Sequence, residues 1–407
     1  MSHKLTIIMP CYNCSATLKE AVDSIYTQDL QIPFEVVMVD DASTDQTWEL
    51  MQKLSKEHRE IRLFQHDKNL GGGASRNTAV AKSDGDFIFC LDGDDVLPPN
   101  MMQKLINYLD EKKCDGVVFE ESRFFTTNTH KINGIGKNNN VGRLVNISDL
   151  FDGGAGPLTT VNFLYTKDAF ETVGGYTQHH GFDTQDFGCK FLAKGLSAFI
   201  CPGSYYFHRQ GFKNRSYFER VYASGEYSIN TYLIYENILH LFSKEIRAFI
   251  IAYDIFENSK LVTNNLGSEL AKHYAKNKNN FFVADLKHYL VPNGEELFVE
   301  KIKDSLLNED LFCSAVYLYR QKRFKESLVV YQKLLSQGLT SKILYFNVFR
   351  ANMALVQDSR YEEIERNVLQ LLRSFKPKKQ KINLRPNFFV KLLIKIRQAV
   401  KDYRLIK

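Results

Sequence analysis

The sequence predicts an α/β fold with a mainly parallel sheet and helices on both faces, followed by an all-α region. Over the first hundred residues, apolar β-rich runs alternate with segments whose apolar residues recur at helical spacing. Repeated β-α-β units of this kind require parallel strands joined by crossover helices. From about Ser216 to the end of the chain, glycines are few and the pattern is helical.

Local signals predict the individual elements. The run FEVVMVD at 34–40 is apolar almost throughout, which is typical of a strand buried on both faces. Between 15 and 27, apolar residues recur every three or four positions, which predicts a helix. The strands expected in this way are 5–10, 34–40, 61–66, 86–92, 114–120 and 196–208. The expected helices are 15–27, a helix that follows Ser43 and Thr44 and runs through Leu54, and 71–81.

These patterns divide the chain into three regions. Residues 1–215 hold the α/β domain, residues 216–375 form a helical domain, and residues 376–407 are a basic amphipathic tail. Within the helical domain, residues 311–335 resemble one degenerate tetratricopeptide repeat. The residues at its small and aromatic positions are Ala315, Ser327 and Tyr331.

The composition is that of an ordinary globular protein. Of the 407 residues, 44% are hydrophobic and 25% are charged, which excludes a disordered chain, a collagen-like chain and a multi-spanning membrane protein. The formal net charge is +6, but residues 376–407 alone carry +10 and the remaining chain therefore carries −4. The excess of basic over acidic residues therefore lies in the tail, and the rest of the chain is net acidic.

The sequence predicts a cytoplasmic protein. Peripheral attachment to the cytoplasmic face of the membrane is compatible with this prediction. The apolar run after Met1 is too short for a signal peptide, and no stretch approaches the ~20 apolar residues that cross a bilayer. The seven cysteines are odd in number and mostly lie in or beside apolar runs, which predicts reduced thiols in a reducing compartment. Cys11 and Cys14 form a C-x-x-C, but no second pair completes a zinc site.

Polar residues collect where the predicted strands end, which is where ligands bind in parallel sheets. The motif DGDD at 92–95 puts three carboxylates within four residues. Such carboxylates repel one another unless a cation neutralises them, and oxygen ligands suit Mg²⁺ or Mn²⁺. An ion held there would bind a diphosphate and offset the charge of a leaving phosphate. The alternative is a solvated acidic turn.

Four weaker signals accompany this motif. An Asp of DDASTD at 40–45 can accept a hydrogen bond from a base or ribose, although the motif also suits helix capping. GGGASRN at 71–77 lacks the dinucleotide and P-loop fingerprints but places Arg76 near the expected diphosphate. Asp186 can act as a general base and His208 as a nitrogen ligand, although both residue types are commonly structural in such positions.

In combination these residues resemble family 2 glycosyltransferases with the GT-A fold, over residues 1 to about 215. Five motifs carry the resemblance. They are P-x-Y-N at 10–13, VDDASTD at 39–45, GGGASRN at 71–77, LDGDD at 91–95 and TQDF at 184–187.

The resemblance implies roles for individual residues. The catalytic base maps onto Asp186. Family members often have Glu before this Asp, where the chain has Gln185, and this departure bears on the acceptor-side contacts. The implied nucleotide-sugar-binding residues are Pro10, Tyr12, Asn13, Asp41, Arg76, Asp92 and Asp94, and the implied ligands of Mn²⁺ or Mg²⁺ are Asp94, Asp95 and His208.

The implied reaction is an inverting transfer of a sugar from a nucleotide-diphosphate sugar, with a UDP-sugar favoured by analogy, to an acceptor hydroxyl. The acceptor is a glycan, glycolipid or glycoprotein, as in surface polysaccharide or glycoconjugate synthesis. One alternative is a sugar nucleotidyltransferase, which would need a basic triphosphate loop near the N-terminus, but residues 9–16 contain no Lys or Arg. The other is a non-catalytic helical scaffold protein built on residues 216–375.

The tail predicts contact with an anionic membrane surface. After Pro386, apolar residues recur at helical spacing and basic residues lie mainly on the flanks and the opposite side. This is the pattern of an interfacial helix that lies on a membrane without crossing it. The alternative is a final helix packed on the helical domain. Nucleic acid is not an expected partner, because the rest of the chain is net acidic.

Overall fold

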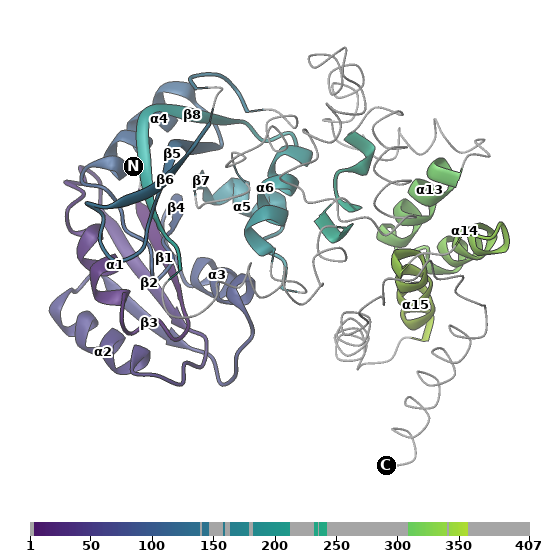
Figure 1. The fold of residues 1–407 in the computed structure, drawn as a ribbon, viewed down its shortest axis with the longest axis horizontal. Helices are drawn as coiled ribbons and strands as arrows, with labels where there is room; N and C mark the ends of the chain where they lie inside the picture. Colours follow the sequence, from purple (N-terminus) through teal and green to yellow (C-terminus); the bar gives the residue numbers. More distant parts are fainter. Residues whose placement is uncertain are drawn as a thin grey trace.

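Figure 1 shows a computed structural model of the chain. The structure describes residues 4–138, 141–145, 158, 163–178, 182–211, 232–234, 236–241, 308–339 and 342–356. The predicted tail at 376–407 and most of 216–307 lie outside these residues, so the membrane-surface prediction is not tested by the structure.

One eight-stranded mixed sheet organises the α/β domain. Four parallel strands lie in the order β3-β2-β1-β4, and the sheet continues through β7, β5 and β6, with β8 paired to β5. Strand β7 is antiparallel to β4 and β5, whereas β8 runs parallel to β5. The strand bounds are β1 (Leu5–Cys11), β2 (Phe34–Asp40), β3 (Ile61–Gln65), β4 (Phe87–Cys90), β5 (Gly116–Phe125), β6 (Ile132–Lys137), β7 (Leu164–Thr166) and β8 (Ala198–Arg209).

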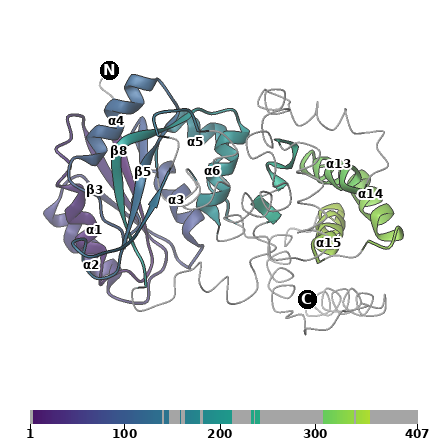
Figure 2. The same cartoon turned by 45° about the horizontal axis from the view of Figure 1, so that its top comes forward.

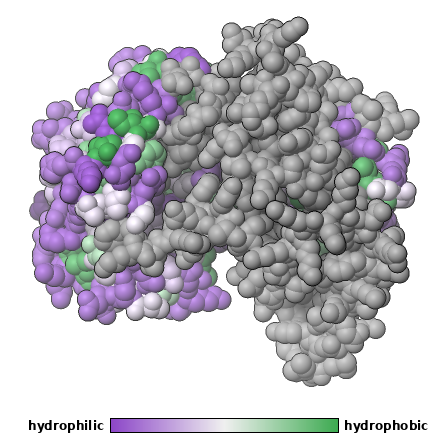
Figure 3. Space-filling model, in the orientation of Figure 1, coloured by the Kyte–Doolittle hydropathy of each residue, from purple (hydrophilic) through white to green (hydrophobic). Residues whose placement is uncertain are grey.

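Helices cover both faces of this sheet, as the sequence predicts (Figures 1 and 2). One buried apolar cluster joins the sheet to α1, α2 and α4, and a second cluster joins it to α3, α5 and α6. The helix bounds are α1 (Leu18–Ile25), α2 (Thr47–Glu57), α3 (Gly72–Ala81), α4 (Met101–Lys112), α5 (Lys167–Val173) and α6 (Asp183–Ala193). The visible face of this domain is mainly hydrophilic (Figure 3). The apolar stripe of each helix therefore packs against the sheet.

The C-terminal part is helical wherever the structure describes it. It consists of α13 (Asn308–Arg320), α14 (Phe324–Ser336) and α15 (Lys342–Val356), with the short 3₁₀ helix η2 (Leu239–Leu241) before them. The cluster behind α6 continues into buried residues of these helices, so the two regions share one core. Among the described residues, no helix is both long and apolar enough to cross a membrane.

Helices α13 and α14 form a tightly packed pair. Ala315, Ser327 and Tyr331 are all buried, and the Ser327 hydroxyl donates to the Ala315 carbonyl oxygen at 2.7 Å. A small residue facing another helix permits this close approach. The predicted helices are confirmed here, and their assignment as a tetratricopeptide-like repeat remains a prediction.

The first two helices begin later than predicted, because the serines before them bond elsewhere. The Ser15 hydroxyl donates to Asp45 at 2.7 Å, and α1 starts at Leu18. Ser43 Oγ accepts the backbone N–H of Asn13 at 3.0 Å, and α2 starts at Thr47. These bonds tie the loop after β1 to the loop after β2.

Candidate active site

The carboxyl ends of β1 and β2 meet in one rigid turn. Pro10 lies at the end of β1, opposite Val39. Asn13 has a left-handed backbone (φ 50°), which Asn tolerates well. Its N–H donates to Ser43 Oγ at 3.0 Å, and its Oδ1 accepts from the Thr44 N–H at 2.8 Å.

Beside this turn lies Tyr12, which is 48% exposed. An aromatic ring held at the ligand-binding edge of a parallel sheet and open to solvent is suited to stack on a nucleobase. The turn also reaches the acidic loop, because Thr17 Oγ1 donates to the Gly93 carbonyl oxygen at 2.9 Å. The exposed ring and the carboxylates of residues 92–95 therefore belong to two loops in direct contact.

Asp41 is buried, and its carboxylate holds the loop before α3. It accepts the backbone N–H groups of Leu70 at 2.8 Å and Gly71 at 2.7 Å, and it pairs with His66 Nδ1 at 2.8 Å. The other ring nitrogen of His66 lies 2.9 Å from Thr78 Oγ1. The predicted nucleoside-pocket residue is thus occupied in shaping the loop that leads into α3.

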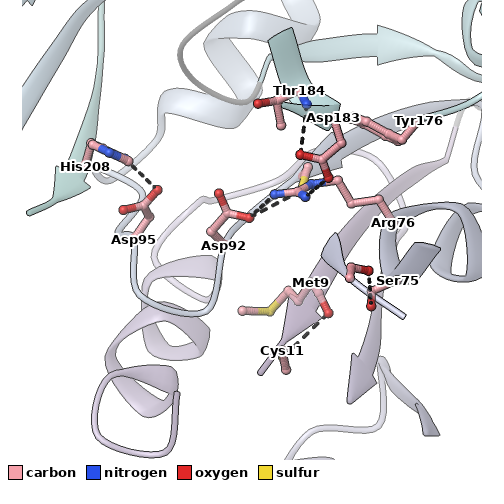
Figure 4. Close-up of polar contacts among 12 residues, drawn as sticks. Met9, Cys11, Ser75, Arg76, Asp92, Asp95, Tyr176, Asp183, Thr184 and His208 are labelled. Carbon is pink, nitrogen blue, oxygen red and sulfur yellow. Dashed lines mark hydrogen bonds and ion pairs between the residues drawn. The ribbon is translucent and has the colours of Figure 1, made fainter. Parts of the chain in front are cut away.

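Arg76 lies between Asp92 and Asp183 (Figure 4). Its two terminal nitrogens each make a 2.6 Å ion pair, one with Asp92 and one with Asp183, and its Nε donates to Cys90 Sγ at 3.3 Å. Burial opposes the charge of the guanidinium, but Asp183 and Asp92 outweigh it and raise the pKa of Arg76. The predicted cation is present at the acidic loop, but its donors bind protein carboxylates and connect α3, the loop after β4 and α6.

Asp95 is turned toward the end of β8, away from Arg76 (Figure 4). Its carboxylate accepts the Tyr206 hydroxyl at 2.6 Å and the Arg209 backbone N–H at 2.8 Å, and it pairs with His208 Nδ1 at 3.1 Å. Burial opposes the charge of His208, but Asp95, Asp94 and Asp92 raise its pKa to about 9. In this arrangement Asp95 and His208 bind each other and anchor the acidic loop.

The Arg209 side chain adds a second anchor to the same loop. Its Nε donates to the Asp94 carbonyl oxygen at 2.7 Å, and its guanidinium pairs with Glu20 of α1. It also lies over the Phe125 ring, 4.4 Å from the centroid. Arg209 of β8, with its partners on α1 and β5, therefore holds the backbone that presents Asp94.

Asp94 differs from its neighbours because it is exposed to solvent. Partial desolvation by the surrounding loop, with the charges of Asp95 and Asp92, raises its pKa to about 7. In the described part of the chain, no three His, Cys, Asp or Glu side chains form a complete metal site. Mg²⁺ commonly takes one or two protein carboxylates and completes its shell with phosphates and waters. An exposed carboxylate among like charges fits that donor set.

The two aspartates of α6 have different surroundings. Asp183 faces Arg76, and its second oxygen accepts the Thr184 N–H at 3.0 Å. Asp186, the predicted base, is 1% exposed, forms an ion pair with Lys190 and accepts from Asn237 Nδ2 at 2.7 Å. Burial raises the pKa of both carboxyls. Asp183 therefore belongs to the cluster around Asp92, and Asp186 contacts the region that precedes the C-terminal helices.

Sequence reasoning missed several residues of this cluster. Asp183 directly precedes the motif TQDF, one helical turn before Asp186, so helical spacing alone could have included it. Tyr206 and Arg209 flank the predicted His208 but carry no local signal, since their partners lie on the loop after β4.

Comparisons with known proteins show which family and which proteins the chain resembles. The family model for Glycosyl transferase family 2 matches residues 6–174. The chain is 32% identical over 119 residues to glycosyltransferase GlyG of Streptococcus pneumoniae serotype 4, a match that covers 29% of this chain and 39% of the relative. It is 33% identical over 114 residues to poly(ribitol-phosphate) beta-N-acetylglucosaminyltransferase TarS of Staphylococcus aureus strain Mu50, covering 28% of this chain and 20% of the relative. These matches span less than half of either relative.

Among solved structures, the chain is similar to S. aureus TarS 1–349 in complex with UDP-GlcNAc. The TM-score is 0.48 and the sequence identity 17%, with 93% of this chain and 95% of that chain covered. The family assignment rests on the family model and on the sheet and loops described above. Residues 6–174 of this chain are therefore a domain of glycosyl transferase family 2.

Proposed function

We propose that the protein transfers a sugar, with inversion, from a UDP-sugar to an acceptor hydroxyl of a cell-surface glycan or glycoconjugate. One observation carries the proposal. The exposed Tyr12 ring and the exposed Asp94 carboxylate lie on two loops that touch through Thr17 and Gly93. A ring that stacks on a base and a carboxylate that attracts a cation match the two ends of a nucleoside diphosphate.

The names of the matched relatives support this reading. TarS of S. aureus is named as a transferase of N-acetylglucosamine to poly(ribitol-phosphate), and GlyG of S. pneumoniae is named as a glycosyltransferase. A cell-surface polymer as acceptor is our extension of those names to this chain. A UDP-linked donor is extended from the family resemblance.

The proposed metal is Mn²⁺ or Mg²⁺, held by Asp94 with the donor diphosphate. When bound, such an ion neutralises the charge that develops on the departing diphosphate. Asp92 and Asp95 each have a partner in the fold, so their part is to hold the loop that presents Asp94. Tyr12 is proposed to orient the base, so that the anomeric carbon lies toward α6.

We propose that α6 supplies the base that removes the proton of the acceptor hydroxyl. Asp183 is the better candidate by position, because it contacts Arg76 and through it Asp92. Asp186, the residue assigned by resemblance, is the alternative. Both carboxylates are buried, so the contacts of Asp183 with Arg76, or those of Asp186 with Lys190 and Asn237, would have to open for an acceptor to reach the base. Apo geometry by itself does not exclude a base, so paired variants must decide.

Release of UDP from UDP-sugars in the presence of Mn²⁺ tests the function, and the Asp94→Asn variant tests the metal site. The substitution removes a charge at nearly constant volume, so the Mn²⁺ concentration needed for half-maximal turnover is expected to rise at least about tenfold. Asp110→Asn, an exposed position on α4, is the matched control. An unchanged Mn²⁺ dependence in Asp94→Asn would contradict the metal assignment. Pyrophosphate release from UTP and a sugar phosphate would indicate a nucleotidyltransferase, and absence of either activity a scaffold.

We also propose that residues 376–407 bind an anionic membrane surface, on the basis of their charge and apolar periodicity. The full chain is expected to float with vesicles that contain anionic lipid, less so at high salt, because the basic residues contribute ~1 kcal/mol each near such a surface. A chain that ends at Phe375 should remain unbound. Equal flotation of both chains, or of neither, would favour a tail packed on the helical domain.

A further inference from the structure

Residues of α4 line a pocket with both polar and apolar groups. Helix α4 lies at the edge of the α/β domain, far from helices α13–α15 (Figures 1 and 2). The volume of the pocket is about 600 Å³, within the range of small-ligand sites. None of its lining residues belongs to the cluster of Tyr12, Asp94 and Asp183. The lining residues are Asp29, Gln31, Asn100, Gln103, Lys104, Asn107, Tyr108, Glu111, Cys201 and Pro202.

The wall formed by the loop before β2 is held firmly against α4. Gln28, at 1% exposure, donates to the Pro98 carbonyl oxygen at 2.9 Å and accepts the Met102 N–H at 3.0 Å. On the pocket side, the Gln103 amide accepts the Gln31 N–H at 2.7 Å and donates to Asn107 Oδ1 at 2.8 Å. The amide groups on this wall therefore have defined orientations before any ligand binds.

The opposite wall is a bulge in β8. The pairing with β5 shifts between Phe119 and Glu121, which leaves extra residues around Pro202 and Gly203. Glu120 accepts the Gly203 N–H at 2.6 Å, and Gly203 has a positive φ of 64°. A Cβ at Gly203 would lie 3.0 Å from Lys104 Nζ, so the glycine leaves room for this amine at the rim. Bulges are specific features that re-aim side chains, often near functional sites.

The chemistry of the lining selects the class of ligand. Four of the ten lining residues carry amides, each able to donate and accept, and a tyrosine adds an aromatic ring and a hydroxyl. Two carboxylates and one amine leave the pocket close to neutral, which does not suit a phosphate or another strong anion. Apolar atoms make up somewhat more of the exposed lining surface than polar atoms, so the pocket offers apolar contact beside its hydrogen-bonding groups. A neutral molecule dense in hydroxyl groups satisfies these donors and acceptors best.

We propose that this pocket is a second saccharide-binding site, which holds a neutral stretch of the glycan that the enzyme extends. Saccharide binding follows from the pocket alone, whereas its identification with the acceptor rests on the proposed function. A site outside the reacting centre would raise the local concentration of a polymeric acceptor without taking part in the chemistry.

The test uses the full chain without donor and a panel of neutral tetrasaccharides of glucose, galactose and N-acetylglucosamine. Saturation-transfer NMR and calorimetry are expected to detect binding of at least one of them. Asn107→Trp, which fills the pocket from an exposed position, should abolish that binding, and Tyr108→Ala should weaken it about tenfold. Asp110→Ala, on the same helix outside the pocket, should bind as the wild type does.

Two further arms keep the outcomes distinct. Asp94→Asn should bind the tetrasaccharide normally, and Asn107→Trp should release UDP from a UDP-sugar at the wild-type rate. If the wild-type protein binds the tetrasaccharide but releases no UDP from any UDP-sugar, the proposed function is refuted. The proposal of a saccharide-binding site still holds in that case. Failure of every tetrasaccharide to bind, or unchanged binding in a folded Asn107→Trp variant, would overturn the site itself.

Discussion

Replacing Asp183 with Asn is expected to lower the turnover of the proposed transferase about 10²- to 10⁴-fold, because an amide of the same shape cannot accept the proton of the acceptor hydroxyl. UDP-sugar binding should remain, since Asp94 and Tyr12 are untouched. Single-turnover kinetics with a UDP-sugar and a separate calorimetric measurement of UDP affinity distinguish loss of chemistry from loss of binding.

Asp186→Asn is the matched comparison for this experiment, one helical turn further along α6. Each variant removes the charge of a buried ion pair, with Arg76 for Asp183 and with Lys190 for Asp186, so both should lower the free energy of unfolding. Asp186→Asn should change turnover much less than Asp183→Asn. If the order is reversed, with Asp186→Asn inactive and Asp183→Asn near normal, the base is Asp186, as the family resemblance implies. Normal turnover in both variants would remove α6 from the chemistry altogether.

Replacing Arg76 with Met is expected to lower the free energy of unfolding by about 3–5 kcal/mol, because it leaves buried carboxylates without their counter-charge. Arg76 is 7% exposed, and both of its ion pairs measure 2.6 Å. Urea unfolding of the variant and the wild type measures the difference. Arg76→Lys keeps the charge but not the two-sided geometry, so its loss should be smaller.

The deficit of the Arg76→Met variant should depend on pH. Burial and Asp92 raise the pKa of Asp183, and Arg76 opposes that rise. Without Arg76, the folded-state pKa of Asp183 lies further above its unfolded value, so ionisation of this group destabilises the fold as pH rises. The deficit should therefore shrink when the pH falls from neutral toward mildly acidic values. A deficit below about 1 kcal/mol that does not vary with pH would indicate pairs as weak as those on a protein surface.

Strongly patterned elements of the fold were predictable in detail. The run at 34–40 became β2 with the predicted bounds, because a strand buried on both faces is continuously apolar. The helix predicted to open at the glycines 71–73 is α3, which ends at Ala81 as expected. Strands β6 and β7 were missed because β7 has three residues and β6 is an edge strand with alternate positions exposed. Their pairing depends on neighbours from distant parts of the chain, and local β propensity does not encode it.

By itself, the sequence determined the mainly parallel sheet and the family. It also determined that Tyr12, Asp41 and the carboxylates of 92–95 lie at one edge, since parallel strands bring their carboxyl ends together. Only the tertiary structure decided what each side chain does at that edge. Arg76 meets Asp92 across 16 residues and Asp183 across 107, and Tyr206 meets Asp95 across 111. No local periodicity relates positions so far apart, because such pairs form only when separate strands and helices pack against one another. In the packed structure Asp94 faces solvent, and the contacts of Asp92 and Asp95 hold the loop that presents it.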